Sequence, residues 1–313
     1  TGRHEEGIEC FDRVLDLDLR NTIAWVQKGK AFAIMGRTRE AIELFEKALA
    51  LNPRDPEAWL HKGLALAGMD EKDRALLAYD RALELSPYLL PALTSKGILL
   101  IKKGEYTDAL AVMDQAIGLE RSDPNAWFGR GVALKILGRY DEALASFDRA
   151  LAINPKDASV FQGKGDLYVL SGQYKEALES YLKASSLDPT NSEPLSRIAL
   201  ACARVGEYGK ASQYAANAVE QRPSDPYLHG DLGRMYYKNN ELDKAIAELT
   251  LAIRGGQTAG GIQVKGLPME PGDSRGIEFY WTYGLALAKT QQCGVATQVF
   301  QALVQEVKDD ETA

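Results

Sequence analysis

The chain has 313 residues, of which 45% are hydrophobic and 26% are charged, the balance of an ordinary folded protein. Its net charge is −7 and it holds no long run of Lys and Arg, so nucleic acid is not expected as the main partner. No apolar stretch approaches the length of roughly 18 residues that a membrane-spanning helix requires, so no membrane span is expected.

Residues 1–21 are predicted to form the second helix of a truncated leading repeat. Gly7, Phe11 and Val14 stand in the columns that the second helix of each later repeat uses. This open start, together with an apolar last helix that no capping helix follows, favours one of two expectations. The chain is either a fragment of a longer protein, or it self-associates through its uncovered terminal helices.

Residues 22–259 carry small residues at a fixed period of 34. One series runs Ala41, Ala75, Ala109, Ala143, Ala177, Ala211 and Ala245. A second series at the same period runs Gly29, Gly63, Gly97, Gly131, Gly165, Ala199 and Gly233. Such a period indicates one supersecondary element stacked many times, here seven contiguous repeats. Function is then expected on an extended curved surface rather than in a buried catalytic pocket.

Each repeat reads as two amphipathic helices, which predicts an all-α solenoid of helix–turn–helix repeats. In the first complete repeat, Trp25 and Phe32 share one helical face, and Ala41 and Phe45 share a face of the next helix. The small residues let two helix backbones approach closely. The large side chains at the start of the first helices are expected to fill the adjacent gap: Trp25, Trp59, Trp127 and Phe161.

The turns also repeat. A column of residues that tolerate the left-handed conformation lies between the two helices of most repeats: Gly36, Gly104, Gly138, Gly172, Gly206 and Asn240. Asp70 stands in this column as the exception. Good N-cap residues precede the first helices: Asp55, Asp123, Asp157, Asn191 and Asp225.

Two repeats show the motif of a known family most clearly. Its members in the first are Trp127, Gly131, Leu134, Ala143, Phe147, Ala150 and Pro155, and in the second Trp59, Gly63, Leu66, Ala75, Tyr79, Ala82 and Pro87. This pattern resembles the tetratricopeptide repeat (TPR) over nearly the whole chain. The resemblance implies a right-handed superhelix whose concave side is lined by the first helix of each repeat. The sixth repeat departs from the pattern with Leu195, Ala199, Cys202 and Ala215.

The period fails after Ile253. Residues 254–276 contain seven glycines and two prolines and are predicted as an inserted loop. Within it, residues 262–264 are either an extended segment that pairs or docks, or part of a flexible excursion. The pattern then resumes, and residues 277–313 are predicted as an eighth repeat.

Neither a catalytic motif nor a cofactor motif is present. His61 and His229 lie five repeats apart and cannot share a metal, and Gly255-Gly256 lacks the context of a phosphate-binding loop. The three cysteines are widely spaced and predict no disulfide framework, so a reduced, cytoplasmic compartment is the default expectation. The chain is expected to be non-catalytic and to need no cofactor.

Residues on the concave side are the candidate ligand contacts. The first repeats present an apolar lane: Val26, Leu60, Leu64, Ile98, Ile101, Phe128 and Val132. Later repeats present a cationic cluster: Arg197, Arg204, Arg234 and Lys238, with Tyr237 nearby. The lane suits an amphipathic helix or a hydrophobic peptide, and the cluster suits a carboxylate or phosphorylated segment. The alternatives are packing against neighbouring helices for the lane, and pairing with Asp231 or Glu193 for the cluster.

The expected function is a protein–protein interaction scaffold that binds a peptide or partner helix in its groove. The alternative is a substrate-recruiting or regulatory segment of a larger glycosyltransferase, kinase or protease. In the resembled family, chaperone-binding members use Lys and Asn one helical turn apart, followed by Asn. Val26, Lys30 and His61 occupy those positions here, so binding to chaperone C-terminal tails is not expected.

Overall fold

The computed structural model describes residues 2–191, 193–270 and 272–311. These residues form 17 helices and one short hairpin, in an N-terminal half that ends at Pro155 and a C-terminal half that begins at Lys156. Each half is an all-α stack of helix–turn–helix pairs, as the 34-residue period predicts.

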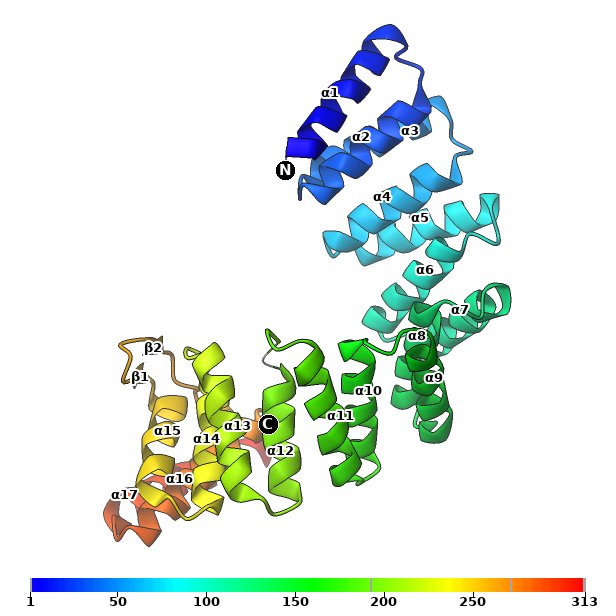
Figure 1. The fold of residues 1–313 in the computed structure, drawn as a ribbon. Helices are drawn as coiled ribbons and strands as arrows, with labels where there is room; N and C mark the ends of the chain where they lie inside the picture. Colours follow the sequence, from blue (N-terminus) through cyan, green and yellow to red (C-terminus); the bar gives the residue numbers. More distant parts are fainter. Residues whose placement is uncertain (1, 192, 271, 312–313) are drawn as a thin grey trace. The chain divides into compact units, whose positions relative to one another are not determined.

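The N-terminal half is a series of helical hairpins in which each helix packs against the next (Figure 1). Its helices are α1 (Gly2–Leu17), α2 (Thr22–Ile34), α3 (Thr38–Leu51), α4 (Pro56–Gly68), α5 (Lys72–Leu85), α6 (Leu90–Lys103), α7 (Tyr106–Leu119), α8 (Pro124–Ile136) and α9 (Tyr140–Ile153).

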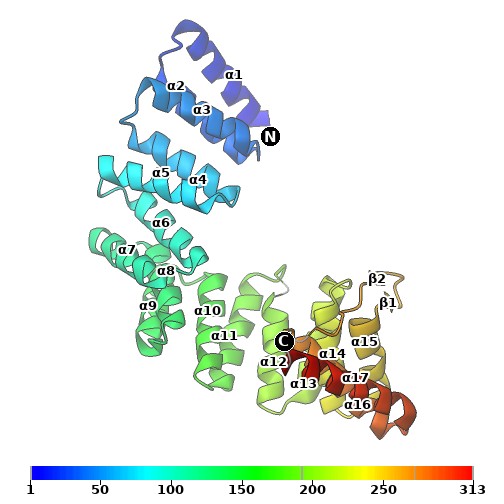
Figure 2. The ribbon, with the colours of Figure 1, turned by 180° about the vertical axis from the view of Figure 1, so that it is seen from behind.

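The C-terminal half continues the same pairing and adds a hairpin after α15 (Figure 2). Its elements are α10 (Ala158–Leu170), α11 (Tyr174–Leu187), α12 (Glu193–Arg204), α13 (Tyr208–Gln221), α14 (Pro226–Lys238), α15 (Leu242–Arg254), β1 (Gly256–Gln257), β2 (Gln263–Val264), α16 (Ser274–Lys289) and α17 (Cys293–Glu311).

The predicted caps begin the first helices of the repeats. The carboxylate of Asp55 accepts hydrogen bonds from two backbone N–H groups of α4, and that of Asp157 accepts from two of α10. Asp123 and Asp225 each accept one such bond, at α8 and α14. The Asn191 side chain accepts from the N–H of Glu193 at 3.0 Å. These bonds satisfy donors that the first turn of a helix leaves free, so the caps fix where each repeat starts.

The turn column is left-handed at every predicted position. The glycines there have φ between 76° and 86°, and Asn240 has φ 63°. Asp70 has φ 61°, so the expectation that it is an exception is wrong. Aspartate is among the few non-glycine residues that enter this region at low cost, and it therefore ends α4 as glycine ends most of the other first helices.

At each glycine of the series that begins with Gly29, the space left by the missing Cβ is occupied by a large side chain from the second helix of the same repeat. A Cβ atom on Gly131 would lie 2.6 Å from the Phe147 ring, which is fully buried. The same close contact joins Gly29 to Phe45, Gly63 to Tyr79, Gly97 to Met113, Gly165 to Tyr181, Gly233 to Leu249 and Gly284 to Phe300. In the sixth repeat the large partner is absent, and Ala199 stands with Ala215.

The tryptophans lie beside this contact at the edge of the core, where Trp25 and Trp59 pack against its buried residues. Trp25, Trp59 and Trp127 are half-buried, and each indole Nε1–H donates to a backbone carbonyl six residues upstream. The N···O distances are 2.9, 3.0 and 2.9 Å. A polar N–H at the end of the ring places these side chains at the edge of the core, where they hold the connection that precedes each first helix.

An ion-pair column that the sequence analysis missed joins consecutive repeats of the N-terminal half. Lys62 of α4 lies 2.8 Å from Glu46 of α3, and Lys96 of α6 lies 2.6 Å from Asp80 of α5. Lys28 pairs with Asp12 in the same way. Each base stands 16 residues after its acid, and each pair recurs after 34 residues, so the signal was present in the sequence.

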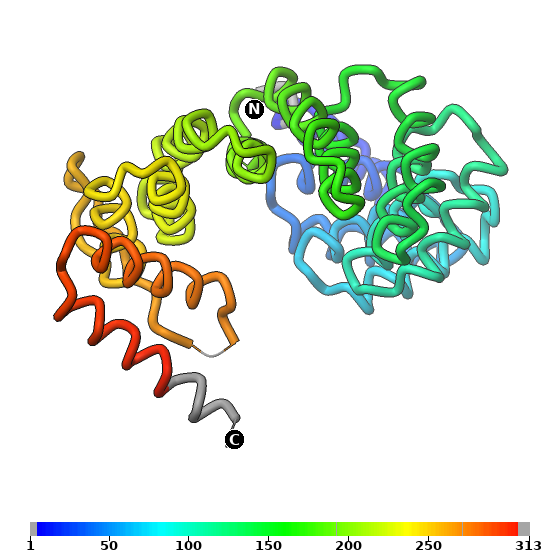
Figure 3. Tube along the Cα trace, turned by 90° about the horizontal axis from the view of Figure 1, so that it is seen from below, coloured from blue at the N-terminus to red at the C-terminus, as the bar shows by residue number. Residues whose placement is uncertain are grey.

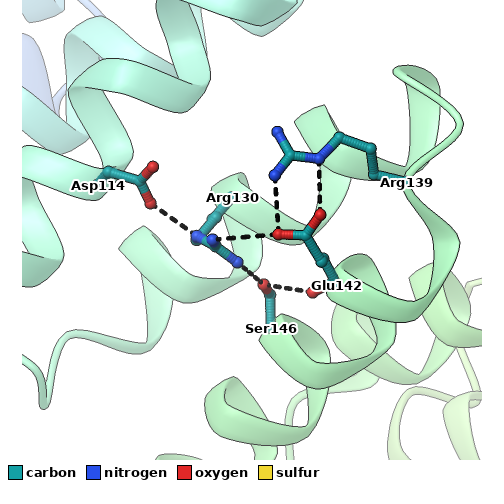
Figure 4. Close-up of polar contacts among 5 residues, drawn as sticks. All are labelled: Asp114, Arg130, Arg139, Glu142 and Ser146. Carbon is teal, nitrogen blue, oxygen red and sulfur yellow. Dashed lines mark hydrogen bonds and ion pairs between the residues drawn. The ribbon is translucent and has the colours of Figure 1, made fainter.

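Arg130 extends this column into a network (Figure 4). Its Nε donates to Asp114 at 2.6 Å, and a terminal nitrogen donates to the Ser146 hydroxyl at 2.8 Å. Ser146 is fully buried and donates in turn to the carbonyl of Glu142. One guanidinium thereby links α7, α8 and α9.

The inserted segment is ordered against the C-terminal half. Strands β1 and β2 pair antiparallel, so the extended alternative for residues 262–264 is the one that the structure has. Val264 is fully buried, and the Leu267 N–H donates to the Ala252 carbonyl at 2.8 Å. The segment leads into α16, which packs beside α14 and α15 (orange beside yellow in Figure 3).

Candidate functional site

The apolar lane of the N-terminal half divides into buried and exposed residues. Val26 and Leu60 are 5% and 2% exposed and belong to the core, so they are not available to a ligand. Their column packs against neighbouring helices, as the alternative interpretation has it. Leu64 and Ile98 are 41% and 40% exposed and share the next column along the helix. The open part of the lane is therefore narrower than the sequence predicts.

The remaining lane residues are half-buried. Ile101 packs against the core around Met113, and the Phe128 ring centroid lies 6.0 Å from that of Phe147. Val132 is half-buried in the same column as Leu64 and Ile98. These three residues can contribute only part of their surface to a ligand.

One end of the lane opens into a cavity of about 300 Å³ between α2, α3 and α4. Leu64, Ile34 and His61 are among the residues that line it. Burial lowers the pKa of His61, and the nearby charge of Lys30 lowers it further. The carboxylate of Glu57 acts in the other direction and raises this pKa by a smaller amount. Most of the residues that line the cavity are apolar. Because its pKa is lowered, the His61 imidazole is neutral at pH 7.

The cationic cluster lies in the C-terminal half, where α12, α14 and α16 surround a cavity of about 580 Å³. Five arginines line it: Arg197, Arg204, Arg222, Arg234 and Arg275. Four carboxylates line it as well: Glu193, Asp225, Asp231 and Glu278. The site is thus strongly charged in both signs, with one more base than acid.

Most of the arginines are already paired within the cavity wall. Arg197 contacts Glu193 at 2.7 Å and also pairs with Asp166, and its hydrogen bond lowers the pKa of Glu193. Arg234 contacts Glu278 at 2.7 Å and Asp231 at 3.8 Å. The pairing alternative therefore holds for these two arginines.

The other members of the predicted cluster are less constrained. Arg204 is exposed and, among the described residues, has no ion pair; its guanidinium carbon lies 5.9 Å from the centre of the Tyr174 ring. Tyr237 lies under the ammonium group of Lys289, at 4.5 Å. Neither Tyr237 nor Lys238 lines the cavity, so the predicted cluster is not a single site.

Two features of the cavity were not predicted. Arg222 and Arg275 join the wall, Arg222 from the end of α13 and Arg275 from the first turn of α16. Arg275 pairs with Asp231 although 44 residues separate them, because the insertion moves α16 out of the simple period. In addition, Ser196 Oγ and Arg197 Nε are buried without a hydrogen-bond partner in the described structure.

The described residues contain no group of three or more His, Cys, Asp and Glu side chains placed to hold a metal ion. Cys202 is buried, and burial raises the pKa of its thiol, whereas Cys10 and Cys293 are exposed. Over the same described residues, none of the helices has both the length and the apolar character that crossing a membrane requires.

Comparison with protein families gives matches along most of the chain. Models of the tetratricopeptide repeat match residues 26–89, 94–158 and 196–260, and a TPR repeat model matches residues 165–206. No curated protein matches the chain.

Several solved structures share the fold. The APC/C hetero-tetramer Cut9-Hcn1 aligns with a TM-score of 0.67 and 20% identity over 75% of this chain and 46% of that chain. The chain thus spans less than half of that protein. PilW, a widely conserved type IV pilus biogenesis factor, aligns with a TM-score of 0.61 and 20% identity over 64% of this chain and 94% of its own. YrrB, a TPR protein with an unusual peptide-binding site, aligns with a TM-score of 0.50 and 23% identity over 60% and 97%.

Proposed function

Because the chain belongs to the tetratricopeptide repeat family, a scaffold typical of protein–protein interaction, we propose that it binds a peptide or partner helix without chemistry. The ligand lies along the first helices of the N-terminal half. There it covers the open part of the apolar lane, which consists of Leu64, Ile98 and the half-buried Val132.

The exposure of Leu64 and Ile98 is the observation that carries this proposal. Both lie in one column of consecutive repeats, and each leaves about two fifths of its surface in water, at 41% and 40%. Covering apolar surface stabilises a complex by roughly 25 cal/mol per Å², so a side chain that seats on both residues gains from each. A repeated column offers such contacts at the spacing of the repeats.

The cavity beside Leu64 supports the same surface. Ile34, which is 67% exposed, and Leu64 line it, together with the neutral His61. A ligand side chain of moderate size fits its volume of about 300 Å³. The fold likeness to YrrB, a TPR protein with a peptide-binding site, also supports a peptide as the ligand.

A selection from a random peptide display library tests the proposal. Selected peptides are measured by fluorescence anisotropy against the wild-type chain and the double variant Leu64→Glu/Ile98→Glu. We expect affinity to fall at least about tenfold, because two charges replace the apolar contact. Leu77→Glu is the control, since Leu77 is 66% exposed but lies on α5, a second helix.

Equal binding to wild-type and lane variant would exclude the lane as the site. A selection that returns no peptide with affinity above background would count against peptide binding as a whole. Circular dichroism of both variants establishes that the helices remain intact.

A further inference from the structure

A cavity of about 410 Å³ lies in the N-terminal half, lined by the ends of the second helices α7 and α9 and by Trp127 of α8. The residues of its wall are Ile117, Arg121, Trp127, Arg149, Ala152 and Ile153. None of them belongs to the apolar lane, whose residues lie on first helices. The cavity is therefore a separate surface of the same half.

The charged groups in this wall are two arginines without a counter-ion. Arg121 and Arg149 are exposed, and within the part of the chain that the structure describes neither guanidinium has an ion pair. The described wall also contains no carboxylate. The acids on either side of Arg121 in the sequence have other contacts, since Glu120 accepts from the Ser122 hydroxyl at 3.0 Å and Asp123 caps α8.

An adjoining cavity of about 340 Å³ does not supply the missing counter-ion. It shares Ile117, Trp127 and Arg149 with the first cavity and adds one carboxylate, that of Asp114. Asp114 is paired with Arg130, whose Nε lies 2.6 Å from the carboxylate oxygen. Arg149 is thus the unpaired base that both cavities share.

The second repeat shows what a paired arginine looks like at the same place. Arg81 stands in the column of Arg149, 68 residues earlier, and lies 2.6 Å from Glu84 of the same helix. In the fourth repeat Ala152 occupies the position of that glutamate. The small side chain therefore leaves Arg149 unpaired and keeps this part of the wall apolar.

Arg121 departs from its column in the same direction. Five other repeats have proline there: Pro53, Pro87, Pro155, Pro189 and Pro223. The backbone role of the position is unchanged, because the Trp127 indole donates to the Arg121 carbonyl as the Trp59 indole donates to that of Pro53. The guanidinium is thus an addition that the connection itself does not need.

We propose that this cavity binds the phosphate group of a phosphorylated peptide. Arg121 and Arg149 contact the phosphate, and an apolar residue beside it covers the indole of Trp127. Two guanidiniums match a group that carries nearly two negative charges, and arginine binds phosphate oxygens through pairs of N–H groups. A carboxylate carries one charge and would leave one arginine without a partner. The site goes beyond the proposed function, because it lies among second helices and does not depend on the lane.

Calorimetry with the whole chain and four probes tests this site. The probes are a pentapeptide amide with phosphoserine between two leucines, its serine counterpart, its glutamate counterpart, and inorganic phosphate. We expect the phosphoserine peptide to bind at least about tenfold more tightly than each of the other three. Its affinity should also fall as pH drops through about 6, where the phosphate loses its second charge, because no residue of the described wall titrates there.

Two variants copy residues that other repeats already have, so the fold is expected to tolerate them. Ala152→Glu gives Arg149 the partner that Arg81 has in Glu84, and it leaves both arginines of the wall in place. Arg121→Pro restores the usual residue of its column. Each should weaken the phosphoserine peptide at least about tenfold. Arg81→Gln is the control, because it removes an arginine of the same column that is already paired, and it should leave the affinity unchanged.

Three results would overturn the phosphate site: equal affinity or no binding for the phosphoserine and serine peptides, equal affinity for the phosphoserine peptide and inorganic phosphate, and no response to Ala152→Glu and Arg121→Pro. The second result would assign the cavity to free phosphate. The variant Leu64→Glu/Ile98→Glu should bind the phosphoserine peptide as the wild-type chain does. Failure of the phosphate site therefore leaves the lane untouched, and a lane selection without any binder overturns the proposed function alone.

Discussion

The imidazole of His229 and the carboxylate of Glu248 form an ion pair, with 2.6 Å between Nδ1 and the carboxylate oxygen, in the core of the C-terminal half. The other ring nitrogen of His229 lies 2.9 Å from the carbonyl of Pro223, six residues upstream. His229 stands in the column of Trp25, Trp59 and Trp127, whose indoles donate to the carbonyl at the same offset. The histidine thus keeps the hydrogen bond of the column and adds a contact with the carboxylate of Glu248.

This pair predicts that stability depends on pH. Burial by itself would lower the pKa of His229, but the hydrogen bonds to Glu248 and Pro223 raise it above its ordinary value. A raised folded-state pKa gives stabilisation that is fully present below about pH 6.5 and is lost as pH rises through the folded-state pKa. We expect the free energy of unfolding of the C-terminal half to fall over that interval, measured by urea unfolding at a series of pH values.

The double variant His229→Trp/Glu248→Leu provides the control, because it recreates the pair that Trp25 and Leu44 occupy in the first complete repeat. Its unfolding free energy is expected to be flat over the same pH interval. If the double variant keeps the slope of the wild-type chain, another group is responsible.

The contact of Gly131 with Phe147 predicts a strong coupling between the two positions. Gly131→Ala places a Cβ atom 2.6 Å from the ring and is expected to cost about 1–3 kcal/mol through overpacking. Phe147→Ala is expected to cost about 3–5 kcal/mol through the cavity that it leaves. The double variant copies Ala199 and Ala215 of the sixth repeat, so its cost should be clearly less than the sum. A double-mutant cycle by urea denaturation measures this, and additive costs would contradict the size complementarity.

The pair of Lys62 and Glu46 predicts a rescue by charge exchange. Lys62 is 15% exposed at its side chain and Glu46 is 48% exposed, so the pair lies at the edge of the solvent. Glu46→Lys brings two cations together and is expected to lower the free energy of unfolding by about 0.5–1 kcal/mol at low salt. The exchange Glu46→Lys/Lys62→Glu should recover most of it. Failure of the exchange to recover stability would show that packing, not charge, explains the loss.

Gly266 predicts how the inserted segment is held. A Cβ atom there would lie 2.5 Å from the backbone nitrogen of Gly255, so Gly266→Ala must push the segment away from the end of α15. We expect faster tryptic cleavage after the exposed Lys265, measured by limited proteolysis. Gly272→Ala is the matched control, because no atom lies within 4 Å of its added Cβ. Equal cleavage rates in the two variants would refute the docking role.

The periodic part of this fold could be predicted from the sequence because each column has one local cause. The N-cap at Asp123 follows from its side chain alone, and the close approach at Gly131 follows from the missing Cβ. Asp70 was misjudged because the left-handed residue was equated with glycine and asparagine, although the position is fixed by the helix end and not by the residue type.

The candidate site was less accessible to prediction. A column identifies which residues are equivalent, but it does not say how much of each side chain the next repeat covers. The buried Val26 and the exposed Leu64 were for this reason both assigned to the apolar lane. Arg275 was missed for a different reason. It lies just outside the eighth repeat as the period defines it, and only the docking of the insertion brings it opposite Asp231.

The tryptophan hydrogen bonds have a practical consequence for spectroscopy. Three of the four tryptophans, Trp25, Trp59 and Trp127, are half-buried in the N-terminal half, and each holds its indole N–H on a carbonyl. The fourth, Trp281, lies in the C-terminal half, is 55% exposed, and has its ring centroid 5.2 Å from that of Phe300. The tryptophan fluorescence of the chain therefore reports mainly on the N-terminal half. Replacing Trp281 with Phe makes this fluorescence a reporter of the N-terminal half alone.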